Sequence, residues 1–426
     1  MSCLCARLAP SVLATLLALA SLPALAADDF DPLALESASA ATKLAAAKPL
    51  RFYVEGAYGR IAQRYDQPSL ESRRVSLDLN WSAPLSERWR VSLSNRLDDI
   101  HPTAGNSRST LNSLREAYAS WQDESGQHIA EFGRINLRNG PAYGFNPTDY
   151  FRDGALRAVT TVDPFALREN RLGTVVARYQ RLWAGGGVSL ALAPKLTQAA
   201  PSSESFSLDL GATNRRNRAL ATWSAQFSDK LSGQLLAFAE QGKGLQLGAN
   251  MTALLSDAAV LHAEFSRGRD DDLFAAQVLG KPRQTTRNRL AVGTTYTTST
   301  SLALTAEYEY NGQAPNRAAW DAAAPAGLNA FGGYLLAAQA RQDIGSRSAW
   351  LLYASQKNVL LKNLDLTGLL RINAGDRSRL GWLELRYHWP RFDGALQWQA
   401  TSGRAASEFG LVPYRQSLQL LGAWYY

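Results

Sequence analysis

Residues 72–98 read SRRVSLDLNWSAPLSERWRVSLSNRLD, and this stretch determines the fold class. Apolar side chains occupy every second position over 75–81 and again over 89–93, with mainly polar side chains between them. A short turn at 83–87, which contains a proline, separates the two runs. Successive side chains of a β-strand point to opposite faces, so a period of two indicates strands and not helices. The stretch therefore predicts two antiparallel strands, each with one apolar and one polar face.

The same alternation continues to the C-terminus, in segments about as long as a tilted strand needs to cross a bilayer, roughly ten residues. The predicted strands lie near 51–61, 72–82, 88–98, 111–122, 127–136, 171–183, 186–194, 216–227, 231–241, 243–255, 258–268, 287–297, 300–311, 347–357, 363–374, 379–389, 391–402 and 415–426. The segment 329–343 is either a helix within a loop or an additional strand, so the number of strands is about 18, within 16–18. The predicted fold is all-β: a transmembrane antiparallel up-and-down β-barrel over residues 50–426.

Short connections alternate with long ones along the chain, which is typical of outer-membrane β-barrels with long extracellular loops. The long connections are predicted at about 99–110, 137–170, 195–215, 269–286, 312–346 and 403–414. Hydrophobic residues make up 46% of the chain, but the only long apolar run is at the N-terminus. This composition excludes a transporter built from many membrane helices.

A soluble β-sandwich or propeller is the alternative to a membrane barrel. Three features oppose it: an apparent export signal, aromatic residues near the ends of many predicted strands, and the pattern of the last strand. That strand places Leu418, Leu420, Trp424 and Tyr426 on one face, with an aromatic residue at the C-terminus. Together these features favour the membrane barrel.

The N-terminal residues 1–26 have the composition of a signal peptide. Arg7 supplies positive charge, an apolar run follows, and the small residues around Ala24 and Ala26 form a cleavage site. A membrane anchor is the alternative. Cleavage would remove both cysteines of the chain, which excludes thiol chemistry in the mature protein. Residues 27–49 are predicted to form a periplasmic segment.

Three sequence segments resemble outer-membrane porin-like channels: LREAYASWQ (114–122), EFGRINLRNG (131–140) and FNPTDYFRDGALR (145–157). The size and the strand count are similar to those of the alginate-export and substrate-specific porin families. The C-terminal strand resembles the recognition strand of Gram-negative outer-membrane proteins. The resemblance implies an outer-membrane location, contact with outer-membrane lipid, and recognition by the barrel-assembly machinery. Monomeric and trimeric barrels share this pattern, so a homo-oligomer stays an open expectation.

Charged side chains of both signs occupy the polar face, which would line the lumen of a barrel. The chain has 37 arginines, 8 lysines and a net charge of +8. The candidate pore-lining residues are Arg74, Arg88, Arg90, Arg96, Arg178, Arg371, Glu307, Glu309, Glu384 and Arg386. Because the two signs nearly cancel on this face, the lumen need not select strongly by net charge. The alternative is that the arginines pair with neighbouring carboxylates as a structural ladder.

The connection 137–170 is the candidate constriction, because loops of this length are usually functional or disordered. Its candidate residues are Asp149, Arg152, Asp153, Arg157, Asp163 and Arg168. Its aromatic residues are Tyr143, Phe145, Tyr150, Phe151 and Phe165. Such residues favour an inward fold against the barrel wall, which would narrow the lumen. The alternative is an exposed extracellular loop.

The sequence predicts an outer-membrane channel that passes small polar or charged solutes and uses no cofactor. One alternative is a dedicated exporter or importer of a polysaccharide or a hydrophobic compound, acting with periplasmic partners. A second alternative is an outer-membrane enzyme, with His262 or His388 in the lumen. The chain contains no HExxH or GxSxG motif and no phosphate-binding loop, which disfavours an enzyme. Basic residues form no patch, so nucleic acid is not an expected partner.

Overall fold

The structure is a computed structural model that describes residues 49–64, 67–101 and 110–426. The predicted signal peptide 1–26 and nearly all of the predicted periplasmic segment 27–49 lie outside the described residues.

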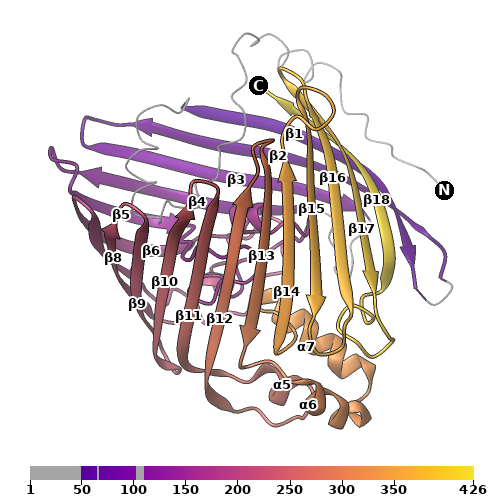
Figure 1. Cartoon of the computed structure of the whole chain (residues 1–426). Helices are drawn as coiled ribbons and strands as arrows, with labels where there is room; N and C mark the ends of the chain where they lie inside the picture. The colour runs from indigo at the N-terminus through magenta and orange to yellow at the C-terminus, as the bar shows by residue number, and fades with distance from the viewer. Residues whose placement is uncertain (1–48, 65–66, 102–109) are drawn as a thin grey trace, which may run out of the picture.

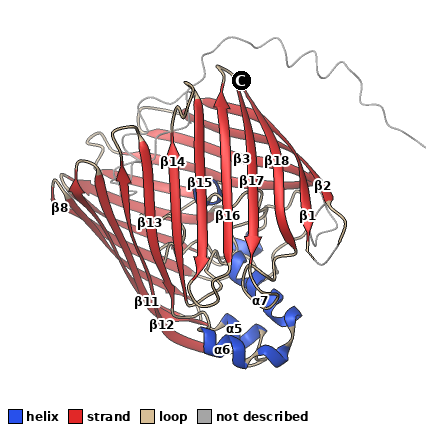
Figure 2. Ribbon diagram, turned by 45° about the vertical axis from the view of Figure 1, so that its right-hand side comes forward, coloured by secondary structure: helices blue, strands red, loops and turns tan. Residues whose placement is uncertain are grey.

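Eighteen strands form one closed antiparallel barrel, which confirms the predicted fold class and strand count (Figures 1 and 2). The strands are β1 (Leu50–Gln63), β2 (Leu70–Pro84), β3 (Trp89–His101), β4 (Thr110–Gln122), β5 (His128–Ile135), β6 (Thr174–Trp183), β7 (Gly186–Ala193), β8 (Arg218–Ser228), β9 (Leu231–Glu240), β10 (Gly244–Ser256), β11 (Ala259–Asp271), β12 (Gln284–Thr297), β13 (Leu302–Asn311), β14 (Ser348–Gln356), β15 (Leu364–Asn373), β16 (Arg379–His388), β17 (Phe392–Ser402) and β18 (Tyr414–Tyr425). Each strand pairs with the next in the chain, and β1 pairs with β18 to close the ring.

The two ends of the barrel differ. At the end that carries the C-terminus, short connections join β2 to β3, β4 to β5 and the following pairs; we call this the short-turn end. The opposite, long-loop end carries the short helices α5 (Leu273–Gln277) and α6 (Arg317–Ala322), the 3₁₀ helix η1 (Ala324–Ala326) and α7 (Leu328–Ala340), as Figure 2 shows. The ambiguous segment 329–343 is therefore mostly helix. None of the helices in the described residues is long and apolar enough to span a membrane.

The outer face of the barrel is apolar, and most of the charged strand side chains are on the inner face. On β2, Val75 is 52% exposed and Leu77 is also exposed, whereas Arg74 and Asp78 on the opposite face are buried. Aromatic side chains gather on β16–β18 at the short-turn end, where the rings of Tyr387 and Trp389 lie 4.4 Å apart. An exposed apolar band with interfacial aromatics is the surface that lipid solvates.

The buried apolar core lies inside the ring of strands. Residues 136–173, which connect β5 to β6, enter the barrel; we call this segment the inner loop. Its short helix is α3 (Pro164–Glu169), and a second short helix, α4 (Leu210–Thr213), lies between β7 and β8. Leu137, Tyr150 and Phe151 of the inner loop pack with inward residues of β6–β9 in one hydrophobic cluster. In Figure 1 this loop is visible behind β10–β14, within the ring of strands.

A charge on the outer face should destabilise the barrel if lipid covers that face. Leu383 is 46% exposed at the middle of β16. We expect Leu383→Arg to lower the free energy of unfolding by about 2–4 kcal/mol, since that is the cost of Arg near the bilayer midplane. Urea titration of the protein folded in lipid vesicles measures the change. The control is Leu383→Ala, which removes apolar area without adding charge; an equal loss in both variants would contradict a lipid-covered face.

Candidate functional site: the lumen and its inner loop

Backbone N–H groups of the inner loop donate to carboxylates on the opposite wall. The amides of Tyr143 and Gly144 donate to Glu307 of β13, at 2.8 and 3.0 Å. The carbonyl of Gly144 accepts a hydrogen bond from Arg371 of β15, at 2.6 Å. The loop therefore crosses the interior from β5 and is held at the far side of the barrel.

Glu264 of β11 is the second anchor of the inner loop. It is fully buried and accepts hydrogen bonds from Ala142 N at 2.7 Å and from Asn146 Nδ2 at 3.0 Å. The backbone N–H and the hydroxyl of Thr148 donate to its other oxygen, at 3.3 and 2.9 Å. A buried carboxylate is costly unless it is fully hydrogen-bonded, and these four donors meet that need.

Two glycines allow the loop to approach the wall this closely. A Cβ at Gly144 would collide with Glu309, Arg371 and Leu351. Gly140 has φ +88°, and a Cβ there would collide with the carboxylate of Glu264. A larger residue at either position would displace the loop from its anchors.

Aromatic contacts fix the loop between the two anchors. Tyr143 stacks on His262 with ring centroids 5.6 Å apart, and it meets Phe165 edge-on at 4.9 Å. Tyr150 stacks on Phe238 of β9 with centroids 4.7 Å apart. The five aromatic residues named from the sequence are thus placed on the barrel interior, where Phe145 and Phe151 are also buried.

The charged residues of the inner loop bind one another or neighbouring loops. Asp149 accepts two hydrogen bonds from Arg171, at 2.8 and 3.0 Å, and both side chains are buried. Arg152 pairs with Asp343 at 2.5 Å. Arg157 pairs with Asp209 at 3.2 Å, and Asp153 pairs with Arg341 at 3.7 Å. Arg168 donates hydrogen bonds to the backbone carbonyls of Asn139 and Gly140. The side chain of Asp163 caps the N-terminus of α3. These ion pairs and hydrogen bonds stabilise the inner loop. Because the charged side chains are engaged in them, few of these side chains face the open lumen. Sequence reasoning missed Arg171, which lies just past the predicted end of the connection at 170.

A closed charge cluster lies on the inner wall of β1–β4. It contains three arginines, Arg74, Arg96 and Arg115, and three carboxylates, Glu55, Asp78 and Asp98. The guanidinium of Arg115 donates two hydrogen bonds to the carboxylate of Asp78, at 2.8 and 2.6 Å. The three positive and three negative charges balance, and the arginines are buried. This arrangement agrees with the alternative prediction that the arginines pair with neighbouring carboxylates as a structural ladder. Sequence reasoning missed Arg115 because a bulge in β4 opposite Ser94 and Asn95 breaks the alternation there.

The other candidate pore-lining residues have several environments. Arg88 does not lie on the inner wall: β3 begins at Trp89, and Arg88 sits in the exposed turn beside Glu124. Glu307 and Glu309 are on the inner wall, but the inner loop covers both, so neither faces open lumen. The rest are half-buried inner-wall residues: Arg90 near Ser82, Arg178 beside Glu131, Arg371 beside Glu309, and Arg386 beside Glu384.

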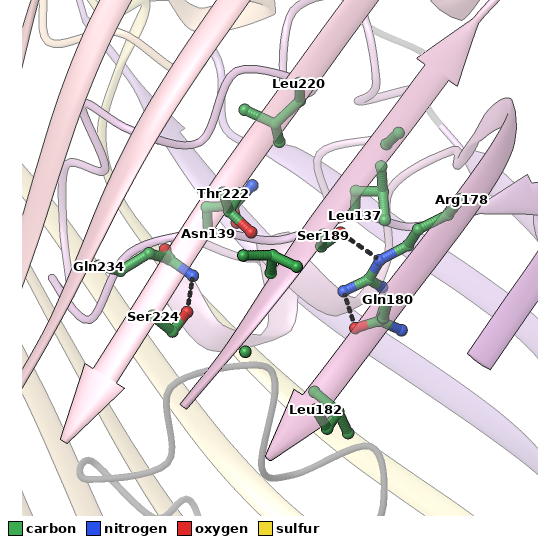
Figure 3. Close-up of a pocket in the computed structure, with 13 residues that line it drawn as sticks. Leu137, Asn139, Arg178, Gln180, Leu182, Ser189, Leu220, Thr222, Ser224 and Gln234 are labelled. Carbon is green, nitrogen blue, oxygen red and sulfur yellow. Dashed lines mark hydrogen bonds between the residues drawn. The ribbon is translucent and has the colours of Figure 1, made fainter. Parts of the chain in front are cut away.

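A small pocket separates the inner loop from β6–β9. Figure 3 shows Leu137 and Asn139 of the loop facing Arg178, Gln180 and Ser224 of the wall. Its volume is about 20 Å³, which is room for about one water molecule. A pocket of this size has no room for a solute larger than water.

A larger cavity, which we call the open cavity, lies on the other side of the inner loop. Its volume is about 210 Å³, and it lies between Thr160 and Thr161 of the inner loop and the inner walls of β16–β18 and β1–β3. Nearer the short-turn end, Arg51 of β1 and Glu169 of the inner loop approach to 3.7 Å, and both side chains are at least half exposed. Unlike the closed charge cluster, this pair is accessible to solutes. Among the described residues no group of His, Cys, Asp or Glu can hold a metal ion.

Burial raises the pKa of Asp163 to about 6. The amides of Phe165 and Ala166, which donate to its carboxylate at 3.4 and 3.3 Å, offset only part of that effect. The nearby carboxylate of Glu384 raises the pKa of Asp163 further.

No family model and no curated protein matches this sequence. Solved structures match over most of the chain. Pseudomonas aeruginosa OccK5 (OpdH) is 11% identical, with 88% of this chain and 97% of that chain covered and a TM-score of 0.52. Acinetobacter baumannii OccAB1 is 9% identical, with 88% and 96% covered and a TM-score of 0.56. Pseudomonas putida OprB is 10% identical, with 88% and 93% covered and a TM-score of 0.51. The chain thus has the fold of Gram-negative outer-membrane porins, which confirms the expected resemblance at the level of the fold.

Removing the second anchor should release the inner loop. Glu264→Ala leaves four donors without their acceptor, and hydrogen bonds to charged groups are worth about 1.5–3 kcal/mol each. We expect trypsin to cleave within the inner loop, for example after Arg157, at least about tenfold faster than in the unaltered protein. The control is Glu124→Ala, which removes an exposed pair worth about 0–1 kcal/mol. Equal cleavage rates for the two variants would contradict the anchoring role.

The raised pKa of Asp163 predicts that the difference in stability between Asp163→Asn and the unaltered protein depends on pH. Between about pH 4 and pH 6 the unfolded state loses the Asp163 proton while the folded state keeps it, so this residue's contribution to stability falls as pH rises through that window. Asp163→Asn keeps a helix-capping side chain and cannot ionise. We measure the urea midpoint of Asp163→Asn minus that of the unaltered protein. We expect this difference to be larger at pH 7 than at pH 4. A difference that does not vary with pH would contradict the raised pKa.

Proposed function

We propose that this protein is an outer-membrane channel through which small polar solutes cross a lumen narrowed by the inner loop. The observation that carries the proposal is the position of that loop: it is anchored to Glu264 and Glu307 on one wall, while a cavity stays open beside the other. The apolar outer face and the porin fold support placement in a membrane.

Export through the signal peptide 1–26 and assembly through the C-terminal strand β18 belong to the same proposal. The outer face of β18 carries exposed Leu418, Leu420 and Trp424, so lipid is its natural environment. Association with further copies of the chain is also part of this proposal and is open to test by crosslinking in the membrane.

The lumenal histidines support transport without catalysis. His262 is buried and its Nε2 lies 2.9 Å from Glu307, the carboxylate that anchors the inner loop. A substrate has no access to this pair while the loop is in place. His388 lies between Asp365 and Asp393, at 3.3 and 2.9 Å, and no serine, threonine or cysteine is paired with it as a nucleophile among the described contacts.

Deleting 141–165 from the inner loop tests the constriction. Arg168 donates to the carbonyl of Gly140 at 3.2 Å, so a short glycine-rich linker suffices to join residues 140 and 166. We expect a larger single-channel conductance in planar bilayers, because the obstruction is gone. We also expect a shift of the reversal potential toward cations, because Glu264, Glu307 and Glu309 become exposed. Unchanged conductance in a barrel that circular dichroism shows to be folded would contradict the proposal.

The accessible pair Arg51 and Glu169 should influence ion selectivity more than an arginine outside the lumen. We expect Arg51→Gln to move the reversal potential under a salt gradient toward cations, since Glu169 then carries an unbalanced negative charge. Arg88→Gln is the matched control, because Arg88 is equally exposed but lies in a turn at the rim. A larger shift for Arg88→Gln than for Arg51→Gln would show that the narrow part of the path lies elsewhere.

A further inference from the structure

Uncharged polar groups in two rows line one wall of the open cavity, and apolar side chains such as Ile61, Ile100 and Trp382 line other parts of it. Gln397 of β17 lies directly opposite Gln419 of β18, and Gln399 lies opposite Ser417. On the next strand, β1, Gly59 lies opposite Gln419. All of these positions are on the inner face, at mid-barrel and toward the long-loop end.

The amide of Gln419 is free to bind a solute. It has no hydrogen-bond partner among the described residues, whereas Gln397 donates to Glu384 and Gln399 donates to the hydroxyl of Tyr414 at 2.7 Å. Gly59 lets β1 approach β18 closely at this point, since a Cβ at Gly59 would meet the backbone oxygen of Leu418 at 2.6 Å. The array therefore offers an unengaged donor and acceptor in a cavity of about 210 Å³.

The charges that border this cavity are already neutralised. Arg74 is 7% exposed and belongs to the balanced charge cluster of β1–β4. Glu384, next to Gln397, accepts two hydrogen bonds from Arg386 at 2.8 and 2.9 Å. Arg73 also borders the cavity, but its side chain is on the outer face of β2. On the loop side, Thr160 and Thr161 add hydroxyl groups and no charge.

Amides and hydroxyls both donate and accept hydrogen bonds, and so do the hydroxyls of a polyol. A polyol that enters the cavity exchanges its hydration for equivalent hydrogen bonds with the wall. An ion loses hydration and finds no uncompensated charge of the opposite sign, so its transfer is less favourable. We infer that this channel, if it conducts as proposed above, prefers uncharged polyhydroxylated solutes of sugar size, with Gln419 as a binding residue in the path.

The test compares three six-carbon chains that differ mainly in charge: sorbitol, the gluconate anion and the N-methylglucamine cation. Efflux of each radiolabelled solute from proteoliposomes is measured, together with ionic conductance of the same preparation. We expect sorbitol to leave several-fold faster than either ion. Gln419→Leu should lower sorbitol efflux by about 2- to 10-fold, the effect of one lost hydrogen bond.

Two further variants separate a binding role from a folding defect. Gln416→Leu changes the same residue type on the outer face of the same strand, and we expect sorbitol efflux to be unchanged. Gln419→Glu keeps the size of the side chain and adds charge, so it should raise N-methylglucamine efflux relative to sorbitol.

The outcomes distinguish this inference from the proposed function. A conducting channel that passes the ions as fast as sorbitol, or that is insensitive to Gln419→Leu and Gln419→Glu, overturns the inference and leaves the channel proposal standing. A folded barrel with neither conductance nor efflux overturns the channel proposal, and the inference with it.

Discussion

The pairing of β1 with β18 is the constraint on which the rest of the structure depends. It runs from Tyr53 opposite Tyr425 to Gln63 opposite Tyr414 and leaves no open sheet edge. In a membrane every backbone polar group needs an internal partner, and only a closed ring of strands gives all of them one. Closure also sorts the side chains: one face of every strand points to the lumen and the other outward. Together with the alternating sequence, the closed ring therefore places apolar side chains outward and most charged side chains inward.

Closure by itself would leave a wide lumen, and the inner loop is what narrows it. The loop is held by buried carboxylates of β11 and β13, which accept its backbone N–H groups. The loop supplies hydrogen-bond donors that these buried carboxylates need, and the carboxylates in turn help to hold the loop inside. This mutual dependence explains why Glu264 and Glu307 are structural groups beneath the loop, and why the open cavity lies beside the opposite wall.

The composition of the chain is a poor guide to the chemistry of its path. Arginine dominates the basic residues, yet Arg74, Arg96 and Arg115 are closed into a cluster with three carboxylates. The polar residues that border the open cavity are mainly glutamine, serine and threonine. The groups that the cavity presents are those side chains left unpaired after the wall and the loop have paired with each other, and the net charge of +8 does not predict which these are.

The sequence by itself determined the barrel, because a period of two over segments of membrane-crossing length is a local property of each strand. It also identified 137–170 as the unusual connection, and its aromatic content correctly favoured an inward fold. It did not reveal Arg115, whose inward position depends on a bulge, or Arg171, which lies just outside the predicted loop. Only the tertiary structure decided that Glu307 and Glu309 are covered, that Arg88 is outside the lumen, and that Gln419 is free. The physical reason is that these outcomes depend on contacts between strands and a loop far apart in the chain, which no local pattern encodes.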